Sequence, residues 1–420
     1  MTSDRERRVL FVAYHFPPLH GSSGLLRTLK FVKYLPDFGI RPYVLTVNPR
    51  AYDNTSDGLL AQIPTGVTVH RAFALDAKKH LSFRGAYPGI LALPDKVASW
   101  IPFGIAAGLR LLTKYKIDLI YSTYPIASAH VIAAVLSRLT RRSWIAEFRD
   151  PIWDDHMNLD RVNLQTRMRI EESCIRYARK LVTVTRGIQD LMAARYPQLP
   201  SEQFLTIPNG FDEEDFAGIK TTSNGRSRRF HLIHAGLLDP VDRDARPFLE
   251  AIRQFMSEKP SVSTELRFDF YSSGHDTFYQ TEVDRLGLKE VVNFLPGIPY
   301  DQIIQRMAEA DILLLFQGGS CNEQIPAKAY EYLRIGKPIL TLAPASSATA
   351  GLVMEASAGE VVNPDDPGKI ARVLSDWTER YLSDQPLPIP DRFVVDGYSR
   401  RNQTKVLANA ISEVVDSDED

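Results

Sequence analysis

The segment that decides the fold is CNEQIPAKAYEYLRIGKPIL, residues 321–340. Pro326 suits the first turn of a helix and Gly336 suits the position after its last residue, so the segment predicts a helix over about residues 326–335. The apolar run 338–342 follows directly and predicts a buried strand. A helix that leads at once into such a strand is typical of a parallel sheet covered by helices.

Apolar runs of strand length, separated by helical stretches, recur along the rest of the chain. A first set lies at residues 8–13, 42–47, 67–71, 118–122, 143–148 and 180–185. A second set lies at residues 230–234, 266–271, 291–294, 312–316 and 338–342. This alternation predicts an α/β protein with two Rossmann-like parallel-sheet domains.

The two sets are separated by a stretch without apolar periodicity. PNGFDEEDF, residues 208–216, supplies turn residues followed by acids, and residues 218–229 are rich in Gly, Ser, Thr and Arg. Such composition is typical of a linker. We therefore predict an N-terminal domain at residues 1–207, a linker at 208–229 and a C-terminal domain at 230–396.

Residues 397–420 are predicted to form a last helix with an acidic tail. Leu407, Ile411 and Val414 recur at spacings of four and three, so they share one face of a helix. That face needs a partner surface. The acidic end, residues 416–420, is expected to be a solvated tail.

The composition excludes several classes of protein. With 420 residues, 44% of them hydrophobic and 24% charged, the chain is neither disordered nor collagen-like. Two cysteines argue against a disulfide framework and a cysteine-based zinc site, and they favour a reducing, cytoplasmic setting. The N-terminus does not resemble a signal peptide, and polar residues interrupt the longest charge-free stretch, residues 119–137. We expect a chain that is soluble or peripherally attached to a membrane.

The charge is unevenly distributed although the net charge is only −1. Residues 1–220 carry 29 Lys and Arg against 21 Asp and Glu, whereas residues 221–420 carry 21 against 30. A basic half fits an anionic partner such as a lipid phosphate or a membrane surface. An uneven spread of solvated surface charge is the alternative.

The turn FPPLHGSSG, residues 16–24, follows the first predicted strand. Its glycines permit close approach of a ligand to the backbone, and a serine can cap the helix that follows. Free amides at a helix N-terminus bind phosphate or hydroxyl-rich ligands, and a nearby arginine adds a cation. An ordinary strand-to-helix turn would look similar. The candidate residues of this loop are Gly21, Ser22, Ser23, Gly24 and Arg27.

The segment 321–340 also carries the strongest candidate chemistry. Glu323 precedes the predicted helix, Glu331 lies about two turns farther along it, and Lys328 lies near its start. The helix belongs to the C-terminal edge of a parallel sheet, where open α/β sheets bind ligands. Carboxylates accept hydrogen bonds from hydroxyl groups, and a helix start with a lysine attracts anions. Two acids on the surface of a helix are the alternative.

Together these motifs resemble the GT-B glycosyltransferases of family 4 over nearly the whole chain. The resemblance rests on the ExxxxxxxE pattern, the FPPxxGSSG turn, PNGFDEEDF and the final helix. FRDP at residues 148–151 and the sequence IPAKAYEYL resemble enzymes that build bacterial exopolysaccharide, O-antigen or capsule. The resemblance implies two domains that face a central cleft, and a C-terminal helix that crosses back to the N-terminal domain. It also implies retaining transfer of a sugar from a nucleoside diphosphate donor held by the C-terminal domain.

The resemblance implies roles for individual residues of the donor site. Glu323 corresponds to the glutamate that contacts the donor sugar, and Glu331 to the one that contacts the ribose. The family commonly uses an Arg and a Lys after the first strand of the C-terminal domain, but HAGLLDPVDRDARPF contains only Arg243 and Arg246. We assign the diphosphate to one of these arginines, with Lys328 as helper, since a departing diphosphate needs cations. The candidate donor-binding residues are Gly236, Arg243, Arg246, Gly274, Lys328 and Glu331.

Two further residues are candidates for catalysis beside Glu323. Many family members carry a histidine at the end of the fourth N-terminal strand, where this chain reads STYP, and the nearest histidine is His130 in the following helix. A buried structural histidine is the alternative. Asp150 in FRDP is a candidate for orienting the acceptor, unless it forms a structural pair with Arg149.

No metal or other cofactor is expected. Asp242 with Asp244 and Asp416 with Asp418 match the DxD pattern that holds a divalent ion in other glycosyltransferases, but such pairs arise often by chance. The expected partners are a nucleotide sugar, a glycan or polyprenyl-diphosphate-linked acceptor, and an anionic membrane surface. Nucleic acid is not expected, because no basic stripe with interleaved aromatic residues is present.

The preferred hypothesis is a cytoplasmic glycosyltransferase, peripheral to the inner face of the plasma membrane, that acts in bacterial surface polysaccharide biosynthesis. A nucleotide-sugar epimerase or a phosphorylase of the same fold is one alternative. A non-catalytic carbohydrate-binding paralogue is another, although the presence of both Glu323 and Glu331 counts against it.

Overall fold

The computed structural model divides the chain into two compact units. Unit 1 comprises Met1–Pro208 and Arg400–Asp420, and unit 2 comprises Asn209–Ser399. The structure describes residues 5–20, 23–82, 87–154, 157, 159–219 and 229–419.

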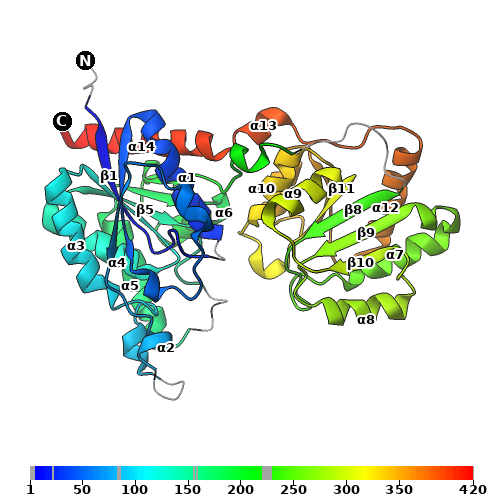
Figure 1. Ribbon diagram of the computed structural model, residues 1–420, viewed down its shortest axis with the longest axis horizontal. Helices are drawn as coiled ribbons and strands as arrows, with labels where there is room; N and C mark the ends of the chain where they lie inside the picture. Colours follow the sequence, from blue (N-terminus) through cyan, green and yellow to red (C-terminus); the bar gives the residue numbers. More distant parts are fainter. Residues whose placement is uncertain are drawn as a thin grey trace. The chain divides into compact units, whose positions relative to one another are not determined.

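Unit 1 is built on a seven-stranded sheet in the order β3-β2-β1-β4-β5-β6-β7, in which every neighbouring pair is parallel (Figure 1). The strands are β1 Arg7–Val12, β2 Ile40–Val47, β3 Thr68–Ala72, β4 Leu119–Thr123, β5 Ser143–Phe148, β6 Lys180–Thr183 and β7 Phe204–Thr206. Six of them correspond to the predicted first set. The seventh, β7, has only three residues and gives little apolar signal.

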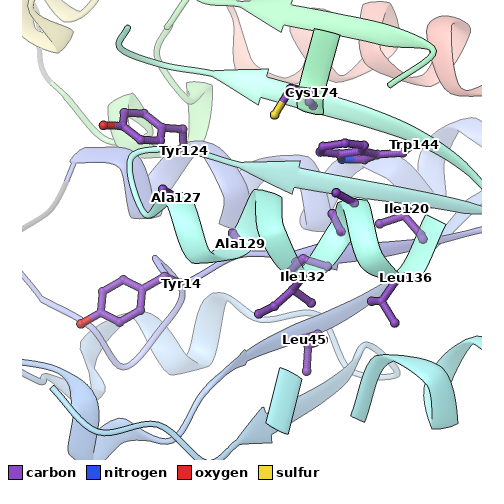
Figure 2. Packing of buried hydrophobic residues seen from close by; sticks show 14 of the residues in the cluster. Tyr14, Leu45, Ile120, Tyr124, Ala127, Ala129, Ile132, Leu136, Trp144 and Cys174 are labelled. Atoms are coloured by element: carbon purple, nitrogen blue, oxygen red, sulfur yellow. The ribbon is translucent and has the colours of Figure 1, made fainter. Parts of the chain in front are cut away.

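Alternate residues of these strands face two separate apolar cores, because side chains along a strand point to opposite faces. Leu10, Val12 and Leu45 pack with α3, α4 and α5, whereas Val9 and Phe11 pack with α1 and α14. Figure 2 shows part of the first core, with Ile132 and Leu136 of α4 near Leu45. The helices are α1 Ser23–Tyr34, α2 Ala77–His80, α3 Trp100–Tyr115, α4 Ala127–Thr140, α5 Arg161–Tyr177, α6 Arg186–Arg195 and α14 Arg400–Glu419.

The last helix, α14, returns to unit 1, as predicted. Its apolar face buries Leu407, Ile411 and Val414 in the core that it shares with α1. The acidic end continues α14 to Glu419, and its residues 416–418 are exposed, although Asp416 also pairs with Arg7 at 2.7 Å. The partner lies in the first strand, too far away in sequence for the pair to be inferred from the tail alone.

Unit 2 contains a six-stranded sheet in the order β10-β9-β8-β11-β12-β13, again with every neighbouring pair parallel. The strands are β8 Phe230–Ala235, β9 Leu266–Tyr271, β10 Val292–Leu295, β11 Ile312–Phe316, β12 Ile339–Leu342 and β13 Gly359–Val362. The prediction of two Rossmann-like parallel sheets is confirmed.

Helices cover both faces of the unit 2 sheet. Leu314 and Phe316 pack with α7, α8 and α12, whereas Leu313 and Leu315 pack with α9, α10, α11 and α13. These helices are α7 Arg246–Glu258, α8 Asp276–Leu286, α9 Tyr300–Glu309, α10 Ala327–Ile335, α11 Ala348–Glu355, α12 Pro367–Leu382 and α13 Arg392–Asp396. The helix predicted at 326–335 is therefore α10, with Gly336 at its C-terminal cap in the left-handed region at φ +78°.

The segment predicted as a linker differs from that expectation in its first half. Residues 209–219 belong to unit 2, where a short 3₁₀ helix, Glu213–Phe216, buries Phe216 beside Phe211. Arg334 of α10 pairs with Glu213 at 2.7 Å and fixes this segment further. The rest of the predicted linker, residues 220–228, lies outside the described residues.

Both sheets have a topological switch point, where successive strands run outward in opposite directions. It lies between β1 and β4 in unit 1 and between β8 and β11 in unit 2. The loops at the carboxyl ends of these strands are the usual ligand sites of open parallel sheets. Among the described residues, no helix is both long enough and apolar enough to cross a membrane.

Candidate active site

The loop after β8 approaches α10 very closely. Gly236 has φ +132°, and its N–H donates to the Tyr271 carbonyl at 2.8 Å. A Cβ at this position would overlap the ammonium nitrogen of Lys328. Only glycine therefore satisfies both the backbone conformation and the proximity of the lysine.

The loop after β9 lies against the same loop. Leu238 N–H donates to the Ser273 carbonyl at 2.9 Å. Gly274 has φ +80°, and a Cβ there would come within 2.8 Å of Leu237. Gly274 therefore shapes the loop that supports Gly236.

Tyr332 fixes α10 against the end of β8. Its buried hydroxyl accepts a hydrogen bond from the Ala235 N–H at 3.1 Å. This contact holds the first turns of α10, and with them the half-buried Lys328, beside the β8 loop. The sheet edge, the start of a helix and a lysine thus meet at the switch point of unit 2.

Lys328 lies in an environment that disfavours its charge. Burial lowers its pKa to about 8, and the neighbouring Arg243 lowers it further, against the opposing effect of Glu331. The side chain of Arg243 carries a second positive charge, and its buried Nε has no hydrogen-bond partner among the described atoms. Two cations that repel each other and are short of partners are suited to bind a multivalent anion.

Arg246 has a different environment from Arg243. It is exposed at the start of α7, and its Nε donates to Asp244 at 2.6 Å. Asp242 instead accepts from the Ser320 N–H at 3.2 Å and so joins the β8 loop to the β11 loop. The two carboxylates of this DxD match therefore have separate structural partners.

Glu323 is exposed in a loop that is fixed from both sides. The buried Gln317, the first residue after β11, donates to the carbonyls of Cys321 at 3.1 Å and Gln324 at 3.4 Å. From the other side, Ala348 N–H donates to the Asn322 carbonyl at 2.8 Å. The loop thus presents Glu323 to the solvent from a rigid backbone.

Glu331 lies on α10, one turn beyond Lys328. Its Oε1 accepts a hydrogen bond from the hydroxyl of Tyr300, the first residue of α9, at 2.8 Å. The structure therefore brings together Gly236, Arg243, Lys328 and Glu331, with Glu323 on the adjoining loop. Arg246 has its own partner on the surface.

In unit 1 the structure gives Arg27 a role other than the predicted phosphate contact. Its guanidinium is fully buried, pairs with Glu147 at 2.7 Å and donates to the Ile207 carbonyl at 2.8 Å. Although burial alone would raise the pKa of Glu147, Arg27 and Arg149 lower it. The carboxylate is also held by the hydroxyl of Thr123 at 2.6 Å. Arg27 thus ties α1 to β5 and to the end of β7.

A different cation, Arg149, lies at the start of α1. A Cβ at Gly24 would overlap its guanidinium, and its Nη2 donates to His15 Nδ1 at 2.9 Å. Its Nη1 is buried without a partner among the described atoms, and only 7% of the residue is exposed. Burial and the charge of Arg149 lower the pKa of His15 to about 3, so this imidazole is neutral. An anion at the helix start would meet both the helix dipole and this guanidinium.

The remaining candidates of unit 1 are placed as follows. Gly21 and Ser22 lie outside the described residues, and Ser23 is the first residue of α1. Asp150 follows β5, and burial raises the pKa of its carboxyl against the lowering effect of Arg149.

His130 is fully buried among Trp144, Phe148 and Tyr124, so it does not face a reacting group as a candidate catalyst would. Its Nδ1 lies 2.7 Å from the Ser122 hydroxyl, and burial lowers its pKa to about 3.

Sequence reasoning missed Gln317 and Tyr332, which shape these sites, and it considered Arg149 only as a structural partner of Asp150. Gln317 is a polar residue directly after the apolar run ILLLF, and that position was a usable signal. Arg149 likewise follows β5 directly. Tyr332 gave no signal, because a tyrosine within a helix is usually part of the core.

Comparisons with known proteins identify a family for each of the two units. The family described as "Glycosyl transferase 4-like domain" matches residues 26–210, and "Glycosyl transferases group 1" matches residues 247–387. No match is found among curated protein sequences.

Solved structures share the fold at low sequence identity. HepE of Anabaena, solved with UDP and glucose, has a TM-score of 0.63 and 17% identity, covering 97% of this chain and 100% of its own. Sucrose-phosphate synthase of Thermosynechococcus elongatus has a TM-score of 0.59 and 14% identity, covering 97% and 96%. WaaG, a glycosyltransferase involved in lipopolysaccharide biosynthesis, has a TM-score of 0.56 and 14% identity, covering 97% and 99%.

The two family matches together span most of the chain and fall on its two sheets. The second match includes the ExxxxxxxE helix at the switch point of unit 2. The chain belongs to the GT-B glycosyltransferases of family 4 and is an enzyme of that type.

Proposed function

We propose that the protein transfers a sugar from a nucleoside diphosphate sugar, with retention of configuration, to a glycan or polyprenyl-diphosphate-linked acceptor. The observation that carries the proposal is the meeting of Lys328 and Arg243 beside Gly236, at the start of α10. The donor diphosphate binds there, between two cations and a helix N-terminus. UDP is the first nucleotide to test, since structures of HepE contain UDP and UDP-glucose.

The two glutamates act on the rest of the donor. Glu323 accepts hydrogen bonds from hydroxyls of the sugar, and Glu331 accepts them from the ribose, in exchange for its present bond from Tyr300. As the sugar–phosphate bond breaks, negative charge develops on the leaving diphosphate. Lys328 and Arg243 stabilise that charge, and no metal or other cofactor is required.

The acceptor binds to unit 1. Its phosphate lies at the start of α1, where Arg149 takes the place that the sequence suggested for Arg27. Asp150, the next residue, orients the acceptor hydroxyl. We place the reaction at the cytoplasmic face of the plasma membrane, in the synthesis of a bacterial surface polysaccharide.

A ligand screen followed by a transfer assay tests this proposal. UDP and UDP-sugars should raise the unfolding temperature, because ligands that bind only the folded state stabilise it by mass action. Release of UDP should then depend on a polyprenyl-diphosphate-linked glycan and should be lost in Glu323→Gln. Conversion of the nucleotide sugar without an acceptor would instead indicate an epimerase. Binding without any conversion would indicate a carbohydrate-binding paralogue.

A further inference from the structure

The segment that follows β5, residues 149–153, is held by arginines from two helices of unit 1. Within α5, Arg167 Nη1 donates to the Ile152 carbonyl at 2.8 Å. At the end of α6, Arg195 Nη2 donates to the Trp153 carbonyl at 2.9 Å. Side chains on two different helices therefore fix the backbone directly after β5.

Arg195 makes a second contact with the same segment. Its guanidinium lies 3.7 Å from the centre of the Trp153 ring, within the range of a cation–π interaction. One arginine thus holds both the backbone and the side chain of Trp153. Replacing this arginine removes both contacts at once.

Glu171 of α5 positions Arg195 in turn, and its side chain is fully buried. Arg195 Nη1 lies 3.3 Å from each carboxylate oxygen of Glu171. Glu171 Oε1 also accepts from Trp153 Nε1 and from the Tyr196 hydroxyl, each at 3.1 Å. Burial raises the pKa of Glu171, against the lowering effect of Arg195. Glu171 therefore joins α5, the end of α6 and residues 149–153 in one hydrogen-bond network.

The same segment carries Asp150, to which the proposed function assigns the acceptor hydroxyl. On one side of Asp150, the bond from Arg149 to His15 at 2.9 Å fixes the chain. On the other side, residues 152 and 153 are fixed by the two arginines of α5 and α6. Since a misplacement of about 1 Å can slow an oriented reaction by about two decades, the anchoring of this backbone bears on how Asp150 meets the acceptor.

We propose that Arg195 and Glu171 are positioning residues for the transfer reaction, because they hold residues 149–153 so that Asp150 meets the acceptor hydroxyl. That assignment rests on the acceptor role that the proposed function gives to Asp150. An ion pair that only stabilised the fold would leave the kinetics of the folded enzyme unchanged. A positioning pair instead affects the use of the acceptor in protein that is fully folded.

The double variant Arg195→Met with Glu171→Gln tests the proposal on the full chain. It removes both charges together, so no unpaired charge is left in the interior, and glutamine can still accept from Trp153 Nε1. With the acceptor that supports UDP release, kcat/KM for the acceptor should fall at least about tenfold, whereas KM for the donor should change less than about threefold. The control Arg176→Met with Glu172→Gln makes the same changes at exposed positions of α5 and should leave both values unchanged.

Quenching of tryptophan fluorescence by acrylamide is a readout that needs neither donor nor acceptor. Trp153 is half-buried, whereas the other three tryptophans are at most 1% exposed. Quenching therefore reports mainly on Trp153. It should increase in the double variant and stay unchanged in the exposed control. Unchanged quenching in the double variant would show that the pair does not hold the segment, and it would overturn the proposal.

Asp150→Asn distinguishes a failure of this proposal from a failure of the proposed function. The expected result is a lower kcat/KM for the acceptor in both Asp150→Asn and the double variant. If Asp150→Asn leaves that value unchanged, Asp150 has no acceptor role, and the positioning role is refuted with it. If Asp150→Asn lowers the value but the double variant does not, despite increased quenching, only the positioning role is refuted.

Discussion

Replacing Lys328 with Met should stabilise the unliganded protein and weaken nucleotide binding at the same time. The ammonium group lies half-buried beside Gly236 and Arg243, and burial lowers its pKa from the ordinary 10.5 to about 8. At 1.36 kcal/mol per pKa unit, holding the charged form in this position costs at most about 3 kcal/mol at neutral pH. Methionine keeps much of the apolar stem and carries no charge.

The size of this effect depends on pH. Because the pKa of Lys328 is lower in the folded protein than in the unfolded chain, the charged form destabilises the fold below about pH 8. That cost fades as the pH rises toward 10.5, where both states lose the proton. Lys328→Met should therefore unfold at a higher temperature than wild type at pH 7, by about 2 to 4 °C per kcal/mol. The difference should vanish near pH 10.5.

With UDP bound, wild type should unfold at a higher temperature than Lys328→Met, which is the reverse of their order without ligand. Loss of a charge-assisted contact to the diphosphate costs about 1.5 to 3 kcal/mol, so the dissociation constant should rise between about tenfold and a hundredfold. Lys369→Met, which makes the same chemical change at an exposed position of α12, is the control and should leave both the unfolding temperature and the UDP shift nearly unchanged. The reasoning fails if Lys328→Met is less stable at pH 7 or keeps the full UDP shift.

The other predictions concern turnover, pH and the buried ion pair. Glu323→Gln should lower kcat by one to two decades while the unfolding temperature and UDP affinity, measured side by side, stay unchanged. UDP affinity of the wild type should fall as the pH rises above about 8, where free Lys328 loses its proton, and titration at pH 6 to 10 would detect this. Glu147→Gln should cost about 3 to 5 kcal/mol in urea unfolding, since Arg27 loses its partner. Because the pKa of Glu147 is lowered in the fold, this contribution exists above pH 4.5 and fades as the pH falls below it, so wild type and variant should converge in acid. Arg149→Met should raise KM for a phosphate-bearing acceptor more than KM for the donor; equal effects on both would argue against an acceptor role.

Much of the fold could be predicted because buried parallel strands are continuous apolar runs. β5, β9 and β11 begin and end at the predicted residues. β13 was not predicted, because its sequence GEVV is too short and too polar to read as an apolar run. Its glycine, Gly359, is required because a Cβ at that position would overlap the Ile339 backbone. That close approach is a property of the neighbouring strand and cannot be inferred from the four residues themselves.

The contacts within the sites were harder to predict from the sequence, because the residues that pair with one another lie far apart along the chain. Arg27 occupies the first turns of a helix, where a cation suits a phosphate, yet its partner Glu147 is 120 residues away. The only sequence signal was a glutamate within the buried strand SWIAEF. By contrast, Lys328, Glu323 and Glu331 share one short segment, and the spacing of that segment was enough to single them out.

A crystal structure of the protein with UDP tests the central claim most directly. The account predicts the diphosphate beside Gly236, with its oxygens about 2.7 to 3 Å from Lys328 Nζ and from the Arg243 guanidinium, and Glu331 near the ribose. A diphosphate bound to Arg246 at the exposed start of α7, or bound without contact to Lys328, would contradict it.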